Sequence, residues 1–124
     1  MTKLAIIGIT DWAETERELD ELGRKLDARE VVLAADYHLN FATATQLLTE
    51  LPPRRLDTLR AIKASGGTSI YAVAKAMGRN YSNVHADVQK LIEHGLVEKD
   101  EGDHVFVPFD DVLVRVNASL LEAA

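Results

Sequence analysis

The chain has no cysteine, and its 124 residues include only three prolines and one tryptophan. The lack of cysteine excludes disulfides, thiol nucleophiles and zinc–thiolate sites. No apolar run approaches the roughly 20 residues of a membrane-spanning helix. The apolar run that ends at Ile9 is also too short for a signal peptide, and no small-residue cleavage site follows it. These absences favour a cytoplasmic protein that does not enter a membrane.

Acidic residues outnumber basic ones, and the net charge of −6 argues against a nucleic-acid partner if it is considered for the chain as a whole. The charge is unevenly distributed, however. Residues 1–52 contain 5 Lys or Arg and 10 Asp or Glu, residues 53–109 contain 8 and 7, and residues 110–124 contain 1 and 3. Binding to nucleic acid requires a local basic face and not a basic chain. The middle segment therefore remains a candidate.

The first 52 residues show a strand-helix-strand pattern followed by a short helix. We predict a strand over Lys3–Ile9, an amphipathic helix over 11–28, a strand over Val31–Ala35 that could extend through Tyr37, and a helix over 43–51. Because both strands are apolar throughout, a second copy of the unit is the simplest cover, by pairing of edges or stacking of faces. The dimerisation residues expected on this basis are Leu4, Ile6, Ile7, Ile9, Val31 and Leu33.

The segment after Pro52 predicts three helices and a hairpin. The helices are expected over 53–65, 70–77 and 81–94, and Gly95 suits the left-handed residue that closes the last one. Strands over 96–99 and 104–107 follow, joined by an acidic turn. We place Arg54, Arg55, Asp57 and Arg60 on the solvent side of the first helix. The order predicts a winged helix-turn-helix, and a last strand is expected over Val112–Val116.

Several stretches of this segment resemble known regulators. A resemblance to MarR-like winged helices is carried by Leu59–Ile62, Ile70–Gly78 and Val84–Lys99. The chain also resembles a family of small prokaryotic predicted regulators, at Leu51–Leu56, Gly78–Tyr81 and Val107–Asp111. Many members of that family look like antitoxins of the TumA–TumE type. The resemblance implies a repressor that binds operator DNA, controls its own transcription as an antitoxin, and binds a partner toxin; the expected homodimer follows from the apolar strands of the first 52 residues.

The helix over 81–94 is the candidate reader of DNA bases. Its apolar stripe is Val84, Val88, Leu91 and Ile92, so the opposite face carries Ser82, Asn83, Ala86, Gln89 and Lys90. Asn and Gln pair with adenine, Ser reaches bases or phosphate, and Ala meets the methyl group of thymine. The remaining candidates for DNA contact are Lys75, Arg79, Asn80, Tyr81, His85 and Lys99. The Tyr81 hydroxyl either donates to phosphate or stays outside while the ring packs on the helices.

Other functions have less support. The acidic turn Asp100–Asp103 would be repelled by a minor groove, which keeps open an alternative, a winged-helix protein-interaction module that does not bind DNA. No two histidines of one element have the spacing of metal ligands, and no nucleophile or acid pair is recognisable. We therefore expect no enzyme, no cofactor and no metal.

These features together predict an α+β protein, a winged helix-turn-helix with an N-terminal strand-helix-strand dimerisation unit. We expect residues 1–52 to form the dimerisation and partner-binding region, residues 53–109 the DNA-binding domain, and residues 110–124 a C-terminal strand and tail. A toxin would bind the acidic N-terminal half or the tail, since opposite fields speed association.

Overall fold

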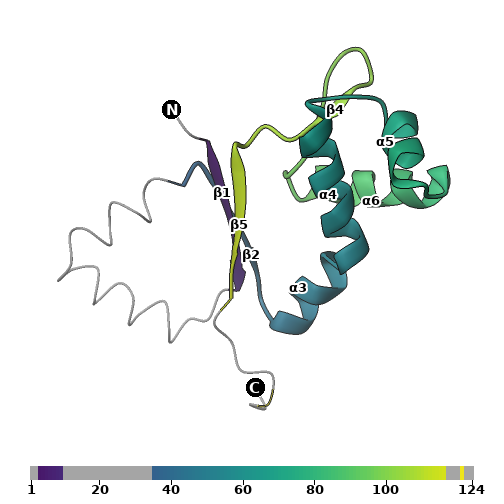
Figure 1. The fold of residues 1–124 in the computed structure, drawn as a ribbon. Helices are drawn as coiled ribbons and strands as arrows, with labels where there is room; N and C mark the ends of the chain where they lie inside the picture. Colours follow the sequence, from purple (N-terminus) through teal and green to yellow (C-terminus); the bar gives the residue numbers. More distant parts are fainter. Residues whose placement is uncertain (1–2, 10–34, 117–120, 122–124) are drawn as a thin grey trace. The chain divides into compact units, whose positions relative to one another are not determined.

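The computed structural model of the chain describes residues 3–9, 35–116 and 121 (Figure 1). The predicted helix over 11–28 lies outside the described residues, as does the predicted strand Val31–Ala35 up to residue 34, with Val31 and Leu33. The described residues form both helices and strands, which confirms the α+β class. They divide into two compact units, which we call unit 1 (Met1–Thr49 with Asp111–Ala124) and unit 2 (Glu50–Asp110).

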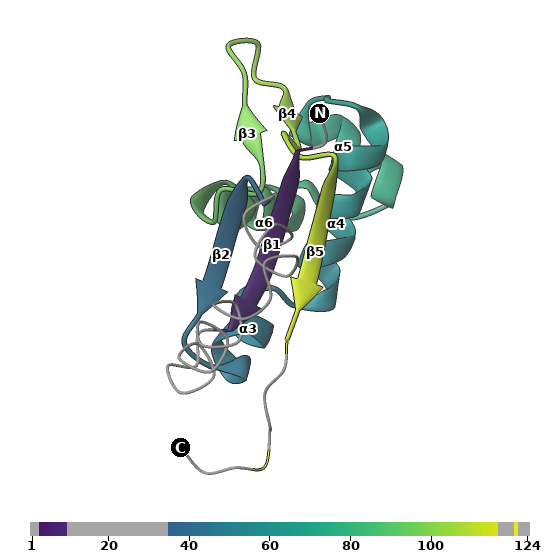
Figure 2. The ribbon, with the colours of Figure 1, turned by 90° about the vertical axis from the view of Figure 1, so that its left-hand side faces the viewer.

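Unit 1 contains a parallel sheet of three strands. The order is β2 (Tyr37–Phe41), β1 (Leu4–Ile9) and β5 (Asp111–Arg115), so the first strand of the chain is the central one (Figure 2). The predicted strands at Lys3–Ile9 and Val112–Val116 are confirmed within a residue or two. The second strand lies further along the chain than predicted, because Ala35 is outside it and it begins at Tyr37.

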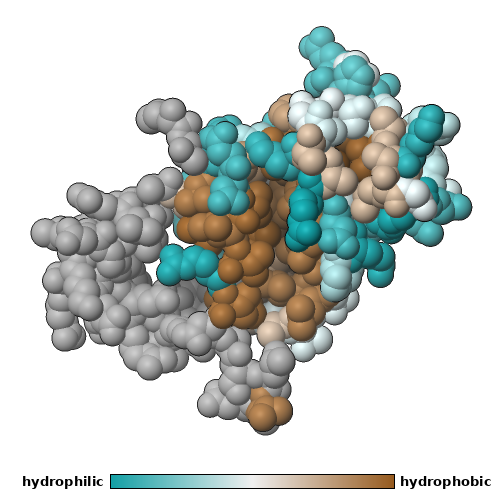
Figure 3. Space-filling view, in the orientation of Figure 1, coloured by the Kyte–Doolittle hydropathy of each residue, from teal (hydrophilic) through white to brown (hydrophobic). Residues whose placement is uncertain are grey.

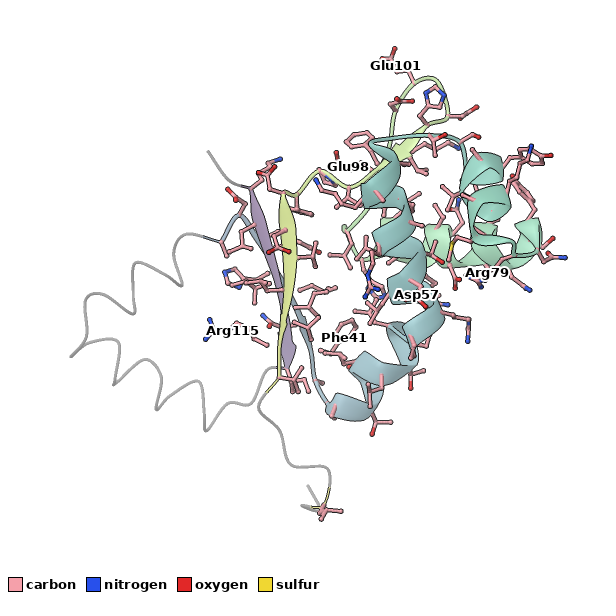
Figure 4. All side chains as sticks on the ribbon, in the orientation of Figure 1. Phe41, Asp57, Arg79, Glu98, Glu101 and Arg115 are labelled. Carbon is pink, nitrogen blue, oxygen red and sulfur yellow. The ribbon has the colours of Figure 1, made fainter. Side chains whose placement is uncertain are left out.

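Register decides which side chains share a face of this sheet. Ile7 lies beside Leu39 and Val114, and this face is apolar. On the other face, Gly8 lies beside Asn40 and Arg115, so this face carries both polar and apolar residues. Figure 4 shows Arg115 and Phe41 on opposite sides of the sheet.

The predicted dimerisation residues of β1 lie on the central strand of this sheet. Both edges of β1 are occupied, by β2 and β5, so this strand has no free edge for a second copy. Ile7 is fully buried within the chain, whereas Leu4, Ile6 and Ile9 keep partial exposure. Ile7 therefore contributes to the core of its own chain.

A short helix, α3 (Ala44–Glu50), follows β2 where a helix over 43–51 was predicted. The Thr43 hydroxyl accepts a hydrogen bond from the Gln46 amide at 3.1 Å, so this side chain caps the first turn. Leu47 is the buried residue of the helix.

Unit 2 begins with helices whose ends are defined by short-range chemistry. They are α4 (Pro53–Ser65), α5 (Ile70–Met77) and α6 (Tyr81–Glu93), which confirms the three predicted helices. Gly66 and Gly78, with φ of 75° and 64°, follow α4 and α5 in the left-handed region that glycine tolerates. The three helices pack on one another around a core that includes Leu59, Ile62, Val73, Val84, Val88 and Leu91.

A small hairpin completes unit 2. Strands β3 (Glu98–Lys99) and β4 (Val105–Phe106) are antiparallel. Thr68, which lies between α4 and α5, pairs with Val105, and the two amide–carbonyl hydrogen bonds measure 3.1 and 2.8 Å. The hairpin is therefore tied by backbone hydrogen bonds to the segment that leads into α5.

Candidate nucleic-acid interface

One face of α6 is open to solvent and carries small and amide side chains. The predicted apolar stripe is fully buried at Val84, Val88 and Leu91, and half-buried at Ile92. The opposite side exposes Ser82, Asn83, Ala86 and Gln89. Since the stripe is packed against α4 and α5, the face that carries these four residues is turned to solvent.

The first turn of α6 combines a cap with an aromatic pair. The Asn80 side-chain oxygen accepts a hydrogen bond from the Ser82 amide at 2.8 Å, so this candidate residue also serves as the helix cap. Tyr81 is 48 % exposed, and its ring centroid lies 5.8 Å from that of His85. Both alternatives for Tyr81 remain, because its ring has a packing partner and much of the residue faces solvent.

Arg79, in the turn between α5 and α6, is held by groups of its own chain. Its Nη2 lies 3.0 Å from the Asp87 carboxylate, and its Nη1 donates to the Thr58 hydroxyl at 2.9 Å. The side chain keeps 24 % of its exposure, and Figure 4 shows it at the turn. Arg79 is a predicted DNA contact, and the structure shows that its Nη1 and Nη2 groups already have partners within the chain.

Asp87 is the residue around which this part of the site is built. Only 1 % of it is exposed, although it carries a charge. Burial of an unpaired carboxylate would cost several kcal/mol, and paired hydrogen bonds offset this cost. Besides Arg79, Asp87 meets the Arg55 Nε at 3.2 Å and the Thr58 hydroxyl at 3.3 Å. The carboxylate thereby joins α6 to α4 and to the turn before α6.

The placement of Arg55 on the solvent side of its helix was wrong. Arg55 is 8 % exposed and donates from Nη1 to the Glu50 carbonyl oxygen at 2.6 Å, in addition to its bond with Asp87. Arg54 is the outer member of the group, with 63 % of its side chain exposed and its Nε 3.8 Å from Asp87. Three arginines thus surround one aspartate, and the group keeps an excess of positive charge.

A sequence signal for Asp87 was present and was missed. It stands three residues after Val84 and four before Leu91, on the buried stripe of α6. A charged residue at such a position requires a partner from another element.

The other basic candidates differ in how far neighbouring acids neutralise them. Lys90 is paired with Glu93 at 3.3 Å, and Lys99 with Asp103 at 3.2 Å. Lys75 is exposed on α5 and makes no ion pair with any residue that the structure describes. Lys75 is therefore the most available cation of unit 2, and the exposed Arg54 and Arg60 have only loose ion pairs, at 3.8 and 3.9 Å.

Charge is unevenly distributed in unit 2, because its helical segment is basic and its hairpin is acidic. Residues 53–97 contain seven Lys or Arg and three Asp or Glu, whereas residues 98–103 contain one and four. The Asp100 carboxylate accepts from the amides of Gly102 and His104 at 2.8 and 3.0 Å, which fixes the turn. Glu101 projects from the tip of the hairpin in Figure 4. An anionic ligand would favour the helical side.

Neither a metal centre nor a membrane-spanning helix is present in the part of the chain that the structure describes. Over residues 3–9, 35–116 and 121, no group of three or more His, Asp or Glu side chains is arranged to hold a metal ion. Within the same described parts of the chain, no helix has the length and apolar character needed to cross a membrane.

One part of the chain matches the model of a known protein family. Residues 50–114 match the model of a family designated HVO_A0114, so the matched region begins with unit 2 and ends inside β5. No curated protein and no solved structure matches the chain.

Proposed function

The chain belongs to the HVO_A0114 family, and we propose that it is a sequence-specific DNA-binding regulator of transcription. The order of elements in unit 2 supports this proposal. A supporting helix α4 precedes the pair α5 and α6, which are joined by a tight turn, and the β3–β4 hairpin follows. An isolated antiparallel bridge also joins Thr68 to Val105 of that hairpin. A winged helix-turn-helix has the same order of elements, so in this proposal α6 serves as the recognition helix and the hairpin as the wing.

The observation that carries the proposal is the exposed face of α6. Asn83 and Gln89 offer both an acceptor and donors, and Ala86 between them offers a methyl group. Recognition helices place their N-terminal residues against base edges in the major groove, where Asn and Gln pair with adenine and Ala meets thymine. Asn83, in the first turn and exposed, is the residue that we expect to read a base.

Phosphate contacts would come from the helical side of unit 2. Lys75 and Arg54 are exposed, and the segment 53–97 carries four more basic than acidic residues. The acidic wing would be repelled by phosphate and would stay away from the minor groove. One recognition helix makes few base contacts, so we propose that the regulator acts as a homodimer on a palindrome, with its helices about 34 Å apart.

The resemblance to TumA-type antitoxins adds a biological setting to this proposal. The chain would repress its own operon and bind a toxin encoded beside it. A toxin would bind outside unit 2, because the acid of the chain lies in residues 1–52 and 110–124. Co-expression with the product of the neighbouring gene tests this part: if growth is not protected, the antitoxin assignment fails.

The experiment that tests DNA binding is fluorescence anisotropy with the protein's own upstream region and with a random duplex of equal length. Asn83→Ala should weaken binding to the upstream region by about 1–3 kcal/mol and change binding to random DNA little, because a base contact is lost. Asn40→Ala, which replaces another exposed asparagine, on β2, is the matched control and should change neither. Equal losses on both duplexes would remove Asn83 from the base-reading role.

A second candidate function is a protein-interaction module of the same shape that does not bind DNA. It is favoured by the ion pairs of Arg79, Lys90 and Lys99, which partly neutralise candidate phosphate contacts, and by the acidic wing. The same titration separates the two functions. If the wild-type protein shows no salt-dependent binding to its upstream region, the second candidate is correct and the first is wrong.

A further inference from the structure

Strand β5 leaves one side of its backbone without a strand partner among the described residues. The Asp111 amide donates to the Lys3 carbonyl oxygen, so Asp111 directs its backbone groups toward β1. Successive residues of a strand direct these groups to opposite sides. Val112 and Val114 therefore point theirs away from the sheet. The Val112 amide is occupied only by the Asp111 side chain, at 2.8 Å.

The same strand exposes large apolar side chains. Leu113, Val114 and Val116 keep 40 %, 51 % and 44 % of their exposure, and Figure 3 shows apolar surface gathered over this strand. At the opposite edge of the sheet, the exposed residues of β2 are the polar His38 and Asn40. An open edge with apolar side chains is a template for pairing with another strand. The difference between the two edges selects β5.

We propose that β5 pairs with β5 of a second copy of this chain, antiparallel and about a two-fold axis that passes through Leu113. A two-fold axis perpendicular to a sheet reverses strand direction and keeps each face on its own side. Only registers that place outward-pointing residues opposite one another are then possible. In the proposed register, Val112 lies opposite Val114 of the second copy and exchanges both backbone hydrogen bonds with it.

Electrostatic attraction between side chains favours this register over the two adjacent registers. With the axis at Leu113, Asp111 lies opposite Arg115 of the second copy, twice per dimer. A shift of the axis to Val112 or Val114 sets Leu113 opposite Asp111 or Arg115, and both charges lose their partner. Neither Asp111 nor Arg115 has an ion pair within the part of the chain that the structure describes. On pairing, the Asp111 carboxylate would exchange its bond with the Val112 amide for the arginine.

The pairing would join two three-stranded sheets into one of six strands, in the order β2-β1-β5-β5-β1-β2. This inference rests on the proposed homodimer and gives it a specific interface. It moves the contact from β1 to the outer edge of β5, which the sequence had not indicated. Its tests measure self-association and not DNA binding. A protein that dimerises as described but ignores DNA would refute the proposed function and leave this inference intact.

Charge reversal tests the register, with sedimentation of the full chain as the measurement. Asp111→Arg and Arg115→Asp should each weaken dimerisation roughly tenfold, because two pairs of like charges then face each other. The double variant restores opposite charges and should return to within about threefold of wild type. Glu101→Arg, the same charge change at the tip of the hairpin, should have no effect. A double variant no better than its parents would overturn the proposal.

A proline substitution tests whether the contact is an edge. Since the Val114 amide points away from β1, Val114→Pro removes a donor to the second copy and none to the sheet of its own chain. We expect it to abolish dimerisation while the melting curve stays cooperative. Val114→Thr keeps the amide and the branched shape, and should remain dimeric. A wild-type chain that is monomeric at about 100 μM, or a proline variant as dimeric as the threonine variant, would overturn the inference.

Discussion

The two units of this chain differ in how far apart in the sequence their contacting elements lie. Unit 2 is one continuous segment, Glu50–Asp110, whose helices follow each other through short turns. Unit 1 brings together strands at Leu4–Ile9, Tyr37–Phe41 and Asp111–Arg115. Parallel neighbours require long connections, and closing such loops costs entropy before any contact forms. Unit 2 is therefore specified by local sequence, and unit 1 depends on both halves of the chain.

The units also differ in where their polar groups are satisfied. In unit 2 the buried Asp87 is surrounded by Arg55, Arg79 and Thr58, so its charge is paired inside the chain. In unit 1 the outward side of β5 has no strand beside it among the described residues. Unit 2 is closed by its own interactions, whereas unit 1 has an edge that another strand can complete.

The largest effect expected from this comparison is that of removing residues 111–124. Without β5, the described sheet is reduced to two strands, and two strands are marginal in water. We expect hydrogen exchange to show lost protection over residues 4–9 and 37–41, with protection retained in α4, α5 and α6. A shorter truncation after Val116 keeps β5 and should preserve the sheet. Protection of β1 in the longer truncation would show that the units depend on each other in another way.

A smaller effect is expected from opening the polar cluster of unit 2. Asp87→Ala leaves the buried Arg55 without its carboxylate, and should lower the free energy of unfolding of this unit by about 3–5 kcal/mol. The control is Glu93→Ala, which removes a solvent-exposed pair with Lys90 and should cost less than about 1 kcal/mol. Urea unfolding followed by helical circular dichroism measures both. Similar losses for the two variants would mean that the cluster is not essential to the core.

The smallest effect concerns two lysines on the basic side of unit 2. If DNA is bound there, Lys75→Ala should reduce the slope of log affinity against log salt by about 0.9, the value for one phosphate contact. Lys90→Ala should reduce it less, because Glu93 already lies 3.3 Å from the ammonium group. Titrations at several salt concentrations give both slopes. A larger change for Lys90 would place the DNA backbone nearer α6 than α5.

Much of unit 2 could be predicted because its signals are local. Pro53 and Gly66 mark the ends of α4, and Ser69, whose hydroxyl accepts from the Ala72 amide at 3.1 Å, caps α5. Asn80 and Gly95, with a φ of 77°, mark the two ends of α6. The exposed face of α6 followed from the same periodicity. The role of the exposed residues in binding DNA stays a prediction.

Less of unit 1 could be predicted. The stretch Tyr37–Phe41 alternates large apolar residues with His38 and Asn40, which is the pattern of a half-buried strand. The strand was predicted instead over the more apolar stretch that precedes it, Val31–Ala35. Arg55 was placed in solvent for a related reason, since charge usually signals exposure, and its partner Asp87 is 32 residues away.

The sequence by itself determined the helices of unit 2, their caps and the exposed side of α6, because these depend on residues within one or two turns of each other. Only the tertiary structure decided that β1 lies at the centre of a parallel sheet and β5 at its edge. It also decided that three arginines meet one buried aspartate. No local pattern encodes these features, since strand neighbours and ion-pair partners are selected by the packing of segments that are distant in sequence.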